Sequence, residues 1–113
     1  MSEQTKYNRA LIHTSMSEKD FQQQVVTMAH ALGWKTYHTL YSIKSALGYP
    51  DLTMVSTRQH RIIFAELKTE KGKISPNQAA WLEALRTPKL VEVYTWRPSD
   101  IATIQQCMEG VPA

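Results

Sequence analysis

The sequence predicts an α/β protein: a mixed sheet of about four strands, flanked by helices, in the order αβββαβα. Segments with helical periodicity alternate with short segments rich in β-branched and aromatic residues. The polar residues 57–60 separate two of the strand segments, which predicts a hairpin. A helical segment then lies between the third and fourth strand segments, which predicts a right-handed βαβ crossover with those two strands parallel.

Length and composition set the frame. The 113 residues are enough for one domain and too few for two. We expect a loosely ordered arm at residues 1–15 and a single domain at residues 16–113. The net charge of +3 permits nucleic acid as a partner without requiring it. One cysteine, Cys107, excludes an internal disulfide framework, and the sequence contains no membrane span or signal core, so we expect a cytoplasmic protein.

The first elements follow from local signals. Ser17 is a good N-cap, the apolar residues after it recur at helical spacing, and Gly33 is expected to end that helix. Strands are expected at residues 34–41, 51–57 and 61–68. The centre of the third strand is continuously apolar, which predicts that both of its faces are covered.

The clearest helix start in the chain is at Ser75. Pro76 occupies the first helical position and Gln78 the capping-box position, and Pro88 is expected to end the helix. The remaining predicted elements are a strand at residues 90–96 and a helix at residues 100–109 that is capped by Ser99.

Three polar residues beside the central strands suggest chemistry. Asp51 opens the second strand, while Glu66 and Lys68 lie near the end of the third and share one of its faces. Carboxylate oxygens suit Mg²⁺ or Mn²⁺, and the backbone carbonyl of Leu67 could add a ligand. Lys68 could position or deprotonate a water and offset charge on a pentavalent phosphate. These groups suffice for metal-dependent hydrolysis of a phosphodiester.

Each of these residues also has a structural interpretation. A glutamate and a lysine two residues apart on a surface strand often form a solvated ion pair. Glu18 could serve only the helix dipole, and a strand histidine such as His38 is commonly just packed. The functional interpretation is favoured because Asp51 and Glu66 lie beside strongly apolar strands, where unpaired charge is costly.

Several motifs occur in the order of a known family. They read SEKDFQQQVV followed by GWKTYH, then GYPDL, AELK and SPNQAAW. Together they resemble the VRR-Nuc domain, a branch of the PD-(D/E)XK nuclease superfamily, from about residue 17 to residue 96. The resemblance implies a restriction-endonuclease-like core in which Asp51 and Glu66 bind the divalent ion and Lys68 serves the attacking water.

The resemblance also implies roles for further residues. Glu18 would complete the metal shell through water, and Gln78 would lean toward the site, a role compatible with capping its helix. Contacts with DNA are expected from His38, Lys44, Ser45, Lys71 and Lys73. For each lysine alone, a solvated loop position is the competing interpretation.

Small stand-alone members of the family are phage or bacterial proteins that cut branched DNA, often as dimers. The resemblance therefore implies a structure-selective DNA endonuclease acting on four-way (Holliday) junctions as a homodimer, without a membrane or an organic cofactor. Such a protein would work in the cytoplasm of a bacterial or phage-infected cell. Candidate dimer residues are Tyr37, Tyr41 and Tyr49. The alternatives are a nuclease for flap, linear or RNA substrates and an inactive nucleic-acid-binding module of the same fold.

Overall fold

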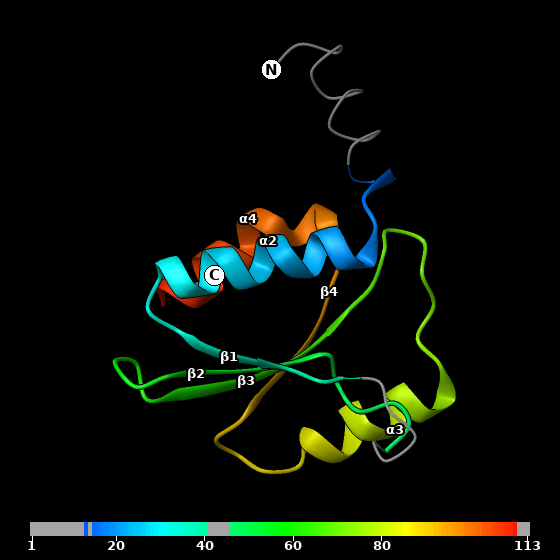
Figure 1. Ribbon diagram of the computed structural model, residues 1–113. Coiled ribbons are helices and arrows are strands. Elements are labelled where there is room, and N and C mark those ends of the chain that lie inside the picture. The colour runs from blue at the N-terminus through cyan, green and yellow to red at the C-terminus, as the bar shows by residue number, and fades with distance from the viewer. Residues whose placement is uncertain (1–12, 14, 41–45, 111–113) are drawn as a thin grey trace.

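The structure is a computed structural model that describes residues 13, 15–40 and 46–110. It confirms the predicted element order and the four-stranded mixed sheet flanked by helices (Figure 1). The elements are α2 (Glu18–Ala31), β1 (Lys35–His38), β2 (Leu52–Ser56), β3 (Arg61–Leu67), α3 (Pro76–Leu85), β4 (Glu92–Trp96), the 3-10 turn η1 (Pro98–Asp100) and α4 (Ile101–Glu109). Within the described residues, no helix is both long and apolar enough to span a bilayer.

The strands lie side by side in the order β1-β2-β3-β4. β1 pairs antiparallel with β2, β2 pairs antiparallel with β3, and β3 pairs parallel with β4. Both the hairpin and the βαβ crossover through α3 are therefore confirmed. The hairpin register places Leu52 opposite Ala65, so Asp51, one residue before Leu52, comes next to Glu66, one residue after Ala65.

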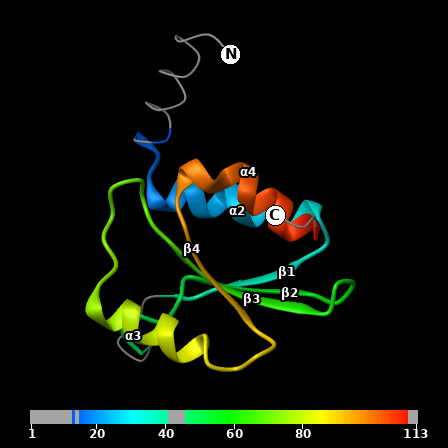
Figure 2. The same cartoon turned by 180° about the vertical axis from the view of Figure 1, so that it is seen from behind.

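The hydrophobic core lies between one face of the sheet and the helices α2 and α4, which run together over that face (Figures 1 and 2). Apolar side chains that recur at helical spacing along α2 and α4 meet there the apolar side chains that alternate along the strands. The fully buried members include Phe21, Val25, Ile104 and Met108 from the helices and Leu52, Met54, Ile63 and Leu67 from the sheet. This core fixes α2, and with it Glu18, relative to the central hairpin.

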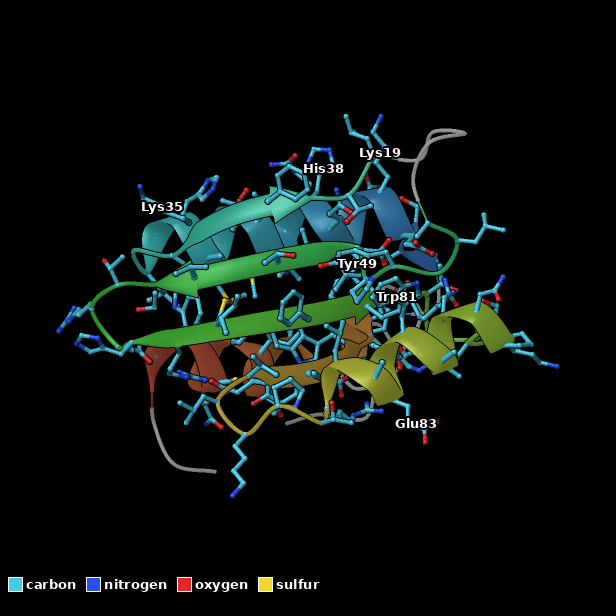
Figure 3. All side chains as sticks on the ribbon, turned by 90° about the horizontal axis from the view of Figure 1, so that it is seen from below. Lys19, Lys35, His38, Tyr49, Trp81 and Glu83 are labelled. Atoms are coloured by element: carbon cyan, nitrogen blue, oxygen red, sulfur yellow. The ribbon has the colours of Figure 1, made fainter. Side chains whose placement is uncertain are left out.

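Among the residues that the structure describes, α3 covers the opposite face of the sheet at one end. There Tyr49 contacts Trp81 of α3 and Phe64 of β3 edge to face, with ring centroids 5.0 and 6.5 Å apart (Figure 3). Farther along this face, Val55 is 37% exposed and Tyr37 is 66% exposed. This open part of the face lies over β1 and β2. Residues 62–65 at the centre of β3 are buried or half-buried, which agrees with the prediction that both faces of the third strand are covered.

The starts of α2 and α4 show which of the predicted helix caps form. Ser17 caps α2 as predicted, since its hydroxyl accepts a hydrogen bond from the Asp20 amide at 3.0 Å. Ser99 does not cap α4, because the chain first forms the 3-10 turn that contains it and enters α4 at Ile101. Pro98 starts that turn, and the Asp100 side chain accepts a hydrogen bond from the Arg97 amide at 2.9 Å. Tyr41 and the other residues of the 41–45 segment lie outside the described residues.

Candidate metal centre

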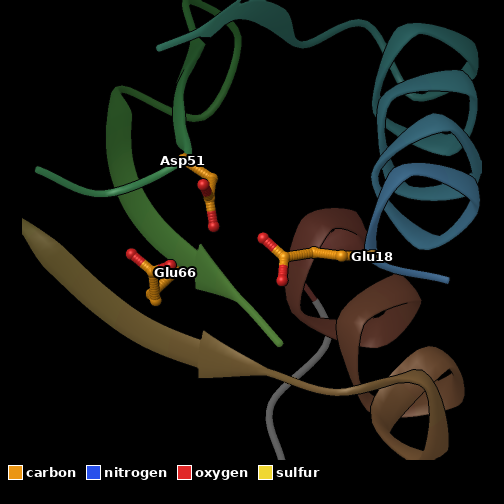
Figure 4. Close-up of side chains that lie close together, drawn as sticks. All are labelled: Glu18, Asp51 and Glu66. Carbon is orange, nitrogen blue, oxygen red and sulfur yellow. The ribbon is translucent and has the colours of Figure 1, made fainter. Parts of the chain in front are cut away.

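Three carboxylates from separate elements converge at one edge of the sheet (Figure 4). Glu18 is the first residue of α2, Asp51 precedes β2, and Glu66 lies in β3. One oxygen from each lies within 4.8 Å of the others. Glu66 is 0% exposed and Asp51 only 4% exposed, whereas Glu18 is half-buried. The structure therefore brings together the three acids that the sequence analysis named as metal ligands.

Asp51 is held from both neighbouring strands. Its Oδ2 accepts a hydrogen bond from the Leu67 amide at 2.8 Å, which ties it to the end of β3. Its backbone carbonyl accepts a hydrogen bond from the Thr39 amide at 2.8 Å, just beyond β1. The Thr39 hydroxyl also donates to the Pro50 carbonyl at 2.8 Å. Both the backbone and the carboxylate of Asp51 are thereby fixed, although the sequence analysis had assigned Thr39 no role.

Gln78 connects Glu66 to α3. Its Nε2 donates a hydrogen bond to Glu66 Oε1 at 3.3 Å. Its Oε1 accepts a hydrogen bond from the Ser75 amide at 2.8 Å in the capping box of α3. Gln78 therefore caps its helix and contacts the site with the same amide group, so the two roles considered from the sequence coexist.

Gly48 allows the loop before Asp51 to pack against the start of α3. Its φ is +87°, and a Cβ at this position would lie 2.4 Å from the carbonyl carbon of Asn77. A side chain is excluded both by the backbone conformation and by the contact. The glycine of the GYPDL motif thus sets the approach of α3, and with it of Gln78, to the carboxylates.

The surroundings of Glu18 and Glu66 disfavour their ionised forms. Glu66 Oε2 is buried and finds no hydrogen-bond donor in the described part of the chain. The pKa of Glu66 lies well above its usual range because burial disfavours the charged form, and because the neighbouring Asp51 carboxylate repels it and hydrogen-bonds only its protonated form. Burial and Asp51 also raise the pKa of Glu18. Lys68 acts in the opposite direction on both pKa values, which places its charge close to the site.

The donor set fits a hard divalent cation. Three carboxylates offer only oxygen, as Mg²⁺ and Mn²⁺ prefer, and a cation would satisfy the orphaned oxygen of Glu66. Glu18, Asp51 and Glu66 each offer one ligand oxygen to such an ion.

The remaining predicted site residues either lie near this cluster or fall outside the described residues. Lys68 directly follows β3, and its amide donates a hydrogen bond to the Trp96 carbonyl at 3.0 Å. Lys71 and Lys73 are exposed in the loop between β3 and α3, and His38 is exposed at the end of β1, so it is not a packed core histidine. The roles of these residues and of the Leu67 carbonyl stay predictions. Lys44 and Ser45 lie outside the described residues.

Comparison with known proteins gives one family. The family model described as the VRR-NUC domain matches residues 2–95, a span that contains all three carboxylates, Lys68 and Gln78. A solved structure described as "VRR_NUC domain" superposes with a TM-score of 0.63 at 25% sequence identity, covering 77% of this chain and 91% of that chain. No curated protein matches the chain.

Proposed function

The chain belongs to the VRR-NUC domain family, which has a nuclease fold, and we propose that it is a divalent-metal-dependent nuclease that hydrolyses phosphodiester bonds in DNA. The observation that carries the proposal is the convergence of Glu18, Asp51 and Glu66: one oxygen from each lies within 4.8 Å of the others, and Asp51 and Glu66 are buried. Buried carboxylates with raised pKa values weaken a fold, so their retention at one point favours a function that requires them.

The residues around the proposed cation have different roles. Asp51 and Glu66 would hold it, Glu18 would reach it through water, and the Leu67 carbonyl would be a further ligand. Gln78 orients Glu66 through the hydrogen bond to its Oε1. A bound Mg²⁺ or Mn²⁺ polarises the phosphate and lowers the pKa of a coordinated water.

Lys68 is the residue we assign to the attacking water. It follows β3 directly, and its backbone is fixed to β4 by the hydrogen bond to Trp96. Its charge stabilises the ionised forms of both Glu18 and Glu66. An ammonium group there can orient a water and offset the negative charge that develops on the phosphate, and its neutral amine form can accept the proton of that water.

DNA is the proposed substrate because exposed basic residues lie on the loop that leaves the site. Lys71 and Lys73 occupy that loop, and phosphate contacts from them would be salt-dependent and independent of sequence. We propose that the DNA is branched and that the enzyme is a homodimer, since two symmetric centres can cut opposing strands. The exposed Tyr37 and Val55 on the open sheet face support a second copy as partner.

Cleavage assays test this proposal. Four-way junction, flap, linear duplex, single-stranded DNA and RNA are incubated with Mg²⁺, Mn²⁺ or chelator, using the wild-type protein, Asp51→Asn and the control Glu83→Gln, which alters an exposed acid on α3 (Figure 3). We expect metal-dependent cutting of junctions that only Asp51→Asn abolishes. Binding without products in any metal would instead indicate an inactive module, and a preference for RNA or linear ends would exclude junction selectivity.

A further inference from the structure

One arginine outside the carboxylate cluster holds the loop that leaves the site. Nη1 of Arg97 donates hydrogen bonds to the backbone carbonyls of Thr69 at 2.7 Å, Glu70 at 3.2 Å and Gly72 at 2.8 Å. Arg97 directly follows β4, and its acceptors begin one residue after Lys68. A single guanidinium group thus supplies hydrogen bonds to three carbonyls of a loop that has no strand partner.

Further hydrogen bonds hold the same loop against the turn after β4 and fold it on itself. The Ser99 amide donates a hydrogen bond to the Glu70 carboxylate at 3.3 Å, and the Gly72 amide donates to the Thr69 carbonyl at 3.1 Å. A Cβ at Gly72 would lie 2.9 Å from the Thr69 hydroxyl oxygen. The loop is therefore closely folded on itself, with its carbonyls turned inward to Arg97.

While the backbone carbonyls of the loop face Arg97, its basic side chains are exposed to solvent. Lys71 and Lys73 lie on either side of Gly72 and are exposed. A loop already ordered around Arg97 can present both charges to a phosphate backbone without losing further conformational freedom on binding.

We propose that Arg97 is a positioning residue that pre-organises the loop of residues 69–73 for the phosphate backbone of the substrate. This inference rests on the proposed nuclease function and assigns substrate affinity to a residue that touches neither the metal ligands nor the substrate. The family model ends at residue 95, so Arg97 lies beyond the matched span.

A second arginine gives a matched control. Arg61 also donates to a backbone carbonyl, that of Cys107, at 2.7 Å, and it pairs with Glu92 through two hydrogen bonds of 2.7 Å. It is the first residue of β3, whereas Glu66 lies five positions along, roughly 16 Å away at the rise of a strand. Loss of Arg61 should lower stability as much as loss of Arg97, but far from the site.

The test compares Arg97→Gln, Arg97→Lys and Arg61→Gln with the wild-type protein. Fluorescence anisotropy measures binding to labelled junction DNA in Ca²⁺ over a range of salt, calorimetry measures Mn²⁺ binding, and thermal unfolding measures stability. We expect Arg97→Gln to weaken DNA binding by about tenfold and to flatten its salt dependence, with Mn²⁺ affinity unchanged. Arg97→Lys, which keeps a cationic donor, should recover most of the affinity, and Arg61→Gln should unfold at lower temperature yet bind DNA like the wild type.

A double-mutant cycle identifies the route. In a Lys71→Ala, Lys73→Ala background, Arg97→Gln should weaken binding by less than about twofold, because the side chains that it positions are gone. The inference is overturned if Arg97→Gln and Arg61→Gln bind DNA equally well, or if Arg97→Gln weakens binding as much in that background as alone. Failure of the proposed function looks different: the wild type would bind DNA without cutting it in any metal, and the anisotropy series would still decide the role of Arg97.

Discussion

Replacing the buried carboxyl of Glu66 by an amide should change how the stability of the metal-free protein depends on pH. Glu66 is 0% exposed, and its pKa is raised to about 9 from the ordinary 4.5, chiefly by burial and then by Asp51. Between those two pH values, the folded protein holds a proton that the unfolded chain has released. Stability contributed by this group is therefore fully present below pH 4.5 and is lost as the pH rises.

The size of the effect follows from proton linkage. One proton bound only by the folded state changes the unfolding free energy by at most about 1.4 kcal/mol per pH unit. From pH 5 to pH 7, the upper bound is therefore about 3 kcal/mol. Gln at position 66 is uncharged at every pH and can still accept the hydrogen bond from Gln78 Nε2. The variant should consequently gain stability relative to the wild type as the pH rises.

Urea unfolding in chelator at pH 5, 7 and 9 measures this difference, with Glu83→Gln as the control for a change of net charge at an exposed site. Taking wild type minus variant removes the titration of all groups that do not contact Glu66. A constant difference between wild type and Glu66→Gln across these pH values would refute the reasoning, because it would mean that Glu66 is ionised in the folded protein throughout.

Three other outcomes follow from the same site. Mn²⁺ binding measured by calorimetry in buffers of different ionisation enthalpy should release about one proton near neutral pH and tighten by up to about tenfold per pH unit, because Glu66 must lose its proton; binding independent of pH would contradict this. Gly48→Ala should destabilise the protein by at least about 3 kcal/mol, against about 1 kcal/mol for Gly33→Ala, since both have a positive φ but only Gly48 meets backbone atoms; equal melting temperatures would contradict it. Gln78→Glu should retain the capping box with Ser75 but lower the melting temperature in chelator and recover it in Mn²⁺, because a carboxylate replaces the donor to Glu66; a melting temperature that Mn²⁺ does not restore would count against that contact.

The sequence was sufficient where a signal and its consequence lie close together in the chain. Ser75, Pro76 and Gln78 mark the start of α3 because a helix cap is settled within four residues. The approach of Asp51 to Glu66 could be predicted for a related reason. Because the turn at residues 57–60 is short, the hairpin register is fixed, and it places the two acids at the open end of the hairpin.

Features that depend on contacts between distant segments could not be predicted from the sequence. The acceptors of Arg97 lie 25 to 28 residues earlier in the chain, and only the packing of the loop against the turn after β4 brings them together. The cap expected from Ser99 failed because Pro98 and Asp100 stabilise a tight turn around it, a competition between local signals that residue preferences alone do not rank. The open sheet face depends on where α3 ends in space, which no periodicity encodes.

The position of Glu66 explains why the site is assembled from four elements. Ala65 and Leu67, its neighbours in β3, are both 0% exposed, so the strand that anchors the core carries the carboxyl into a buried place. There it meets Asp51 from the hairpin, Glu18 from the helix over one face and Gln78 from the helix at the other. A cation bound by these groups would link both helices to the hairpin, and at a hundred times its dissociation constant it would stabilise the fold by about 2.7 kcal/mol. The repulsion that weakens the metal-free protein and the attraction that holds the ion therefore arise from the same carboxylates.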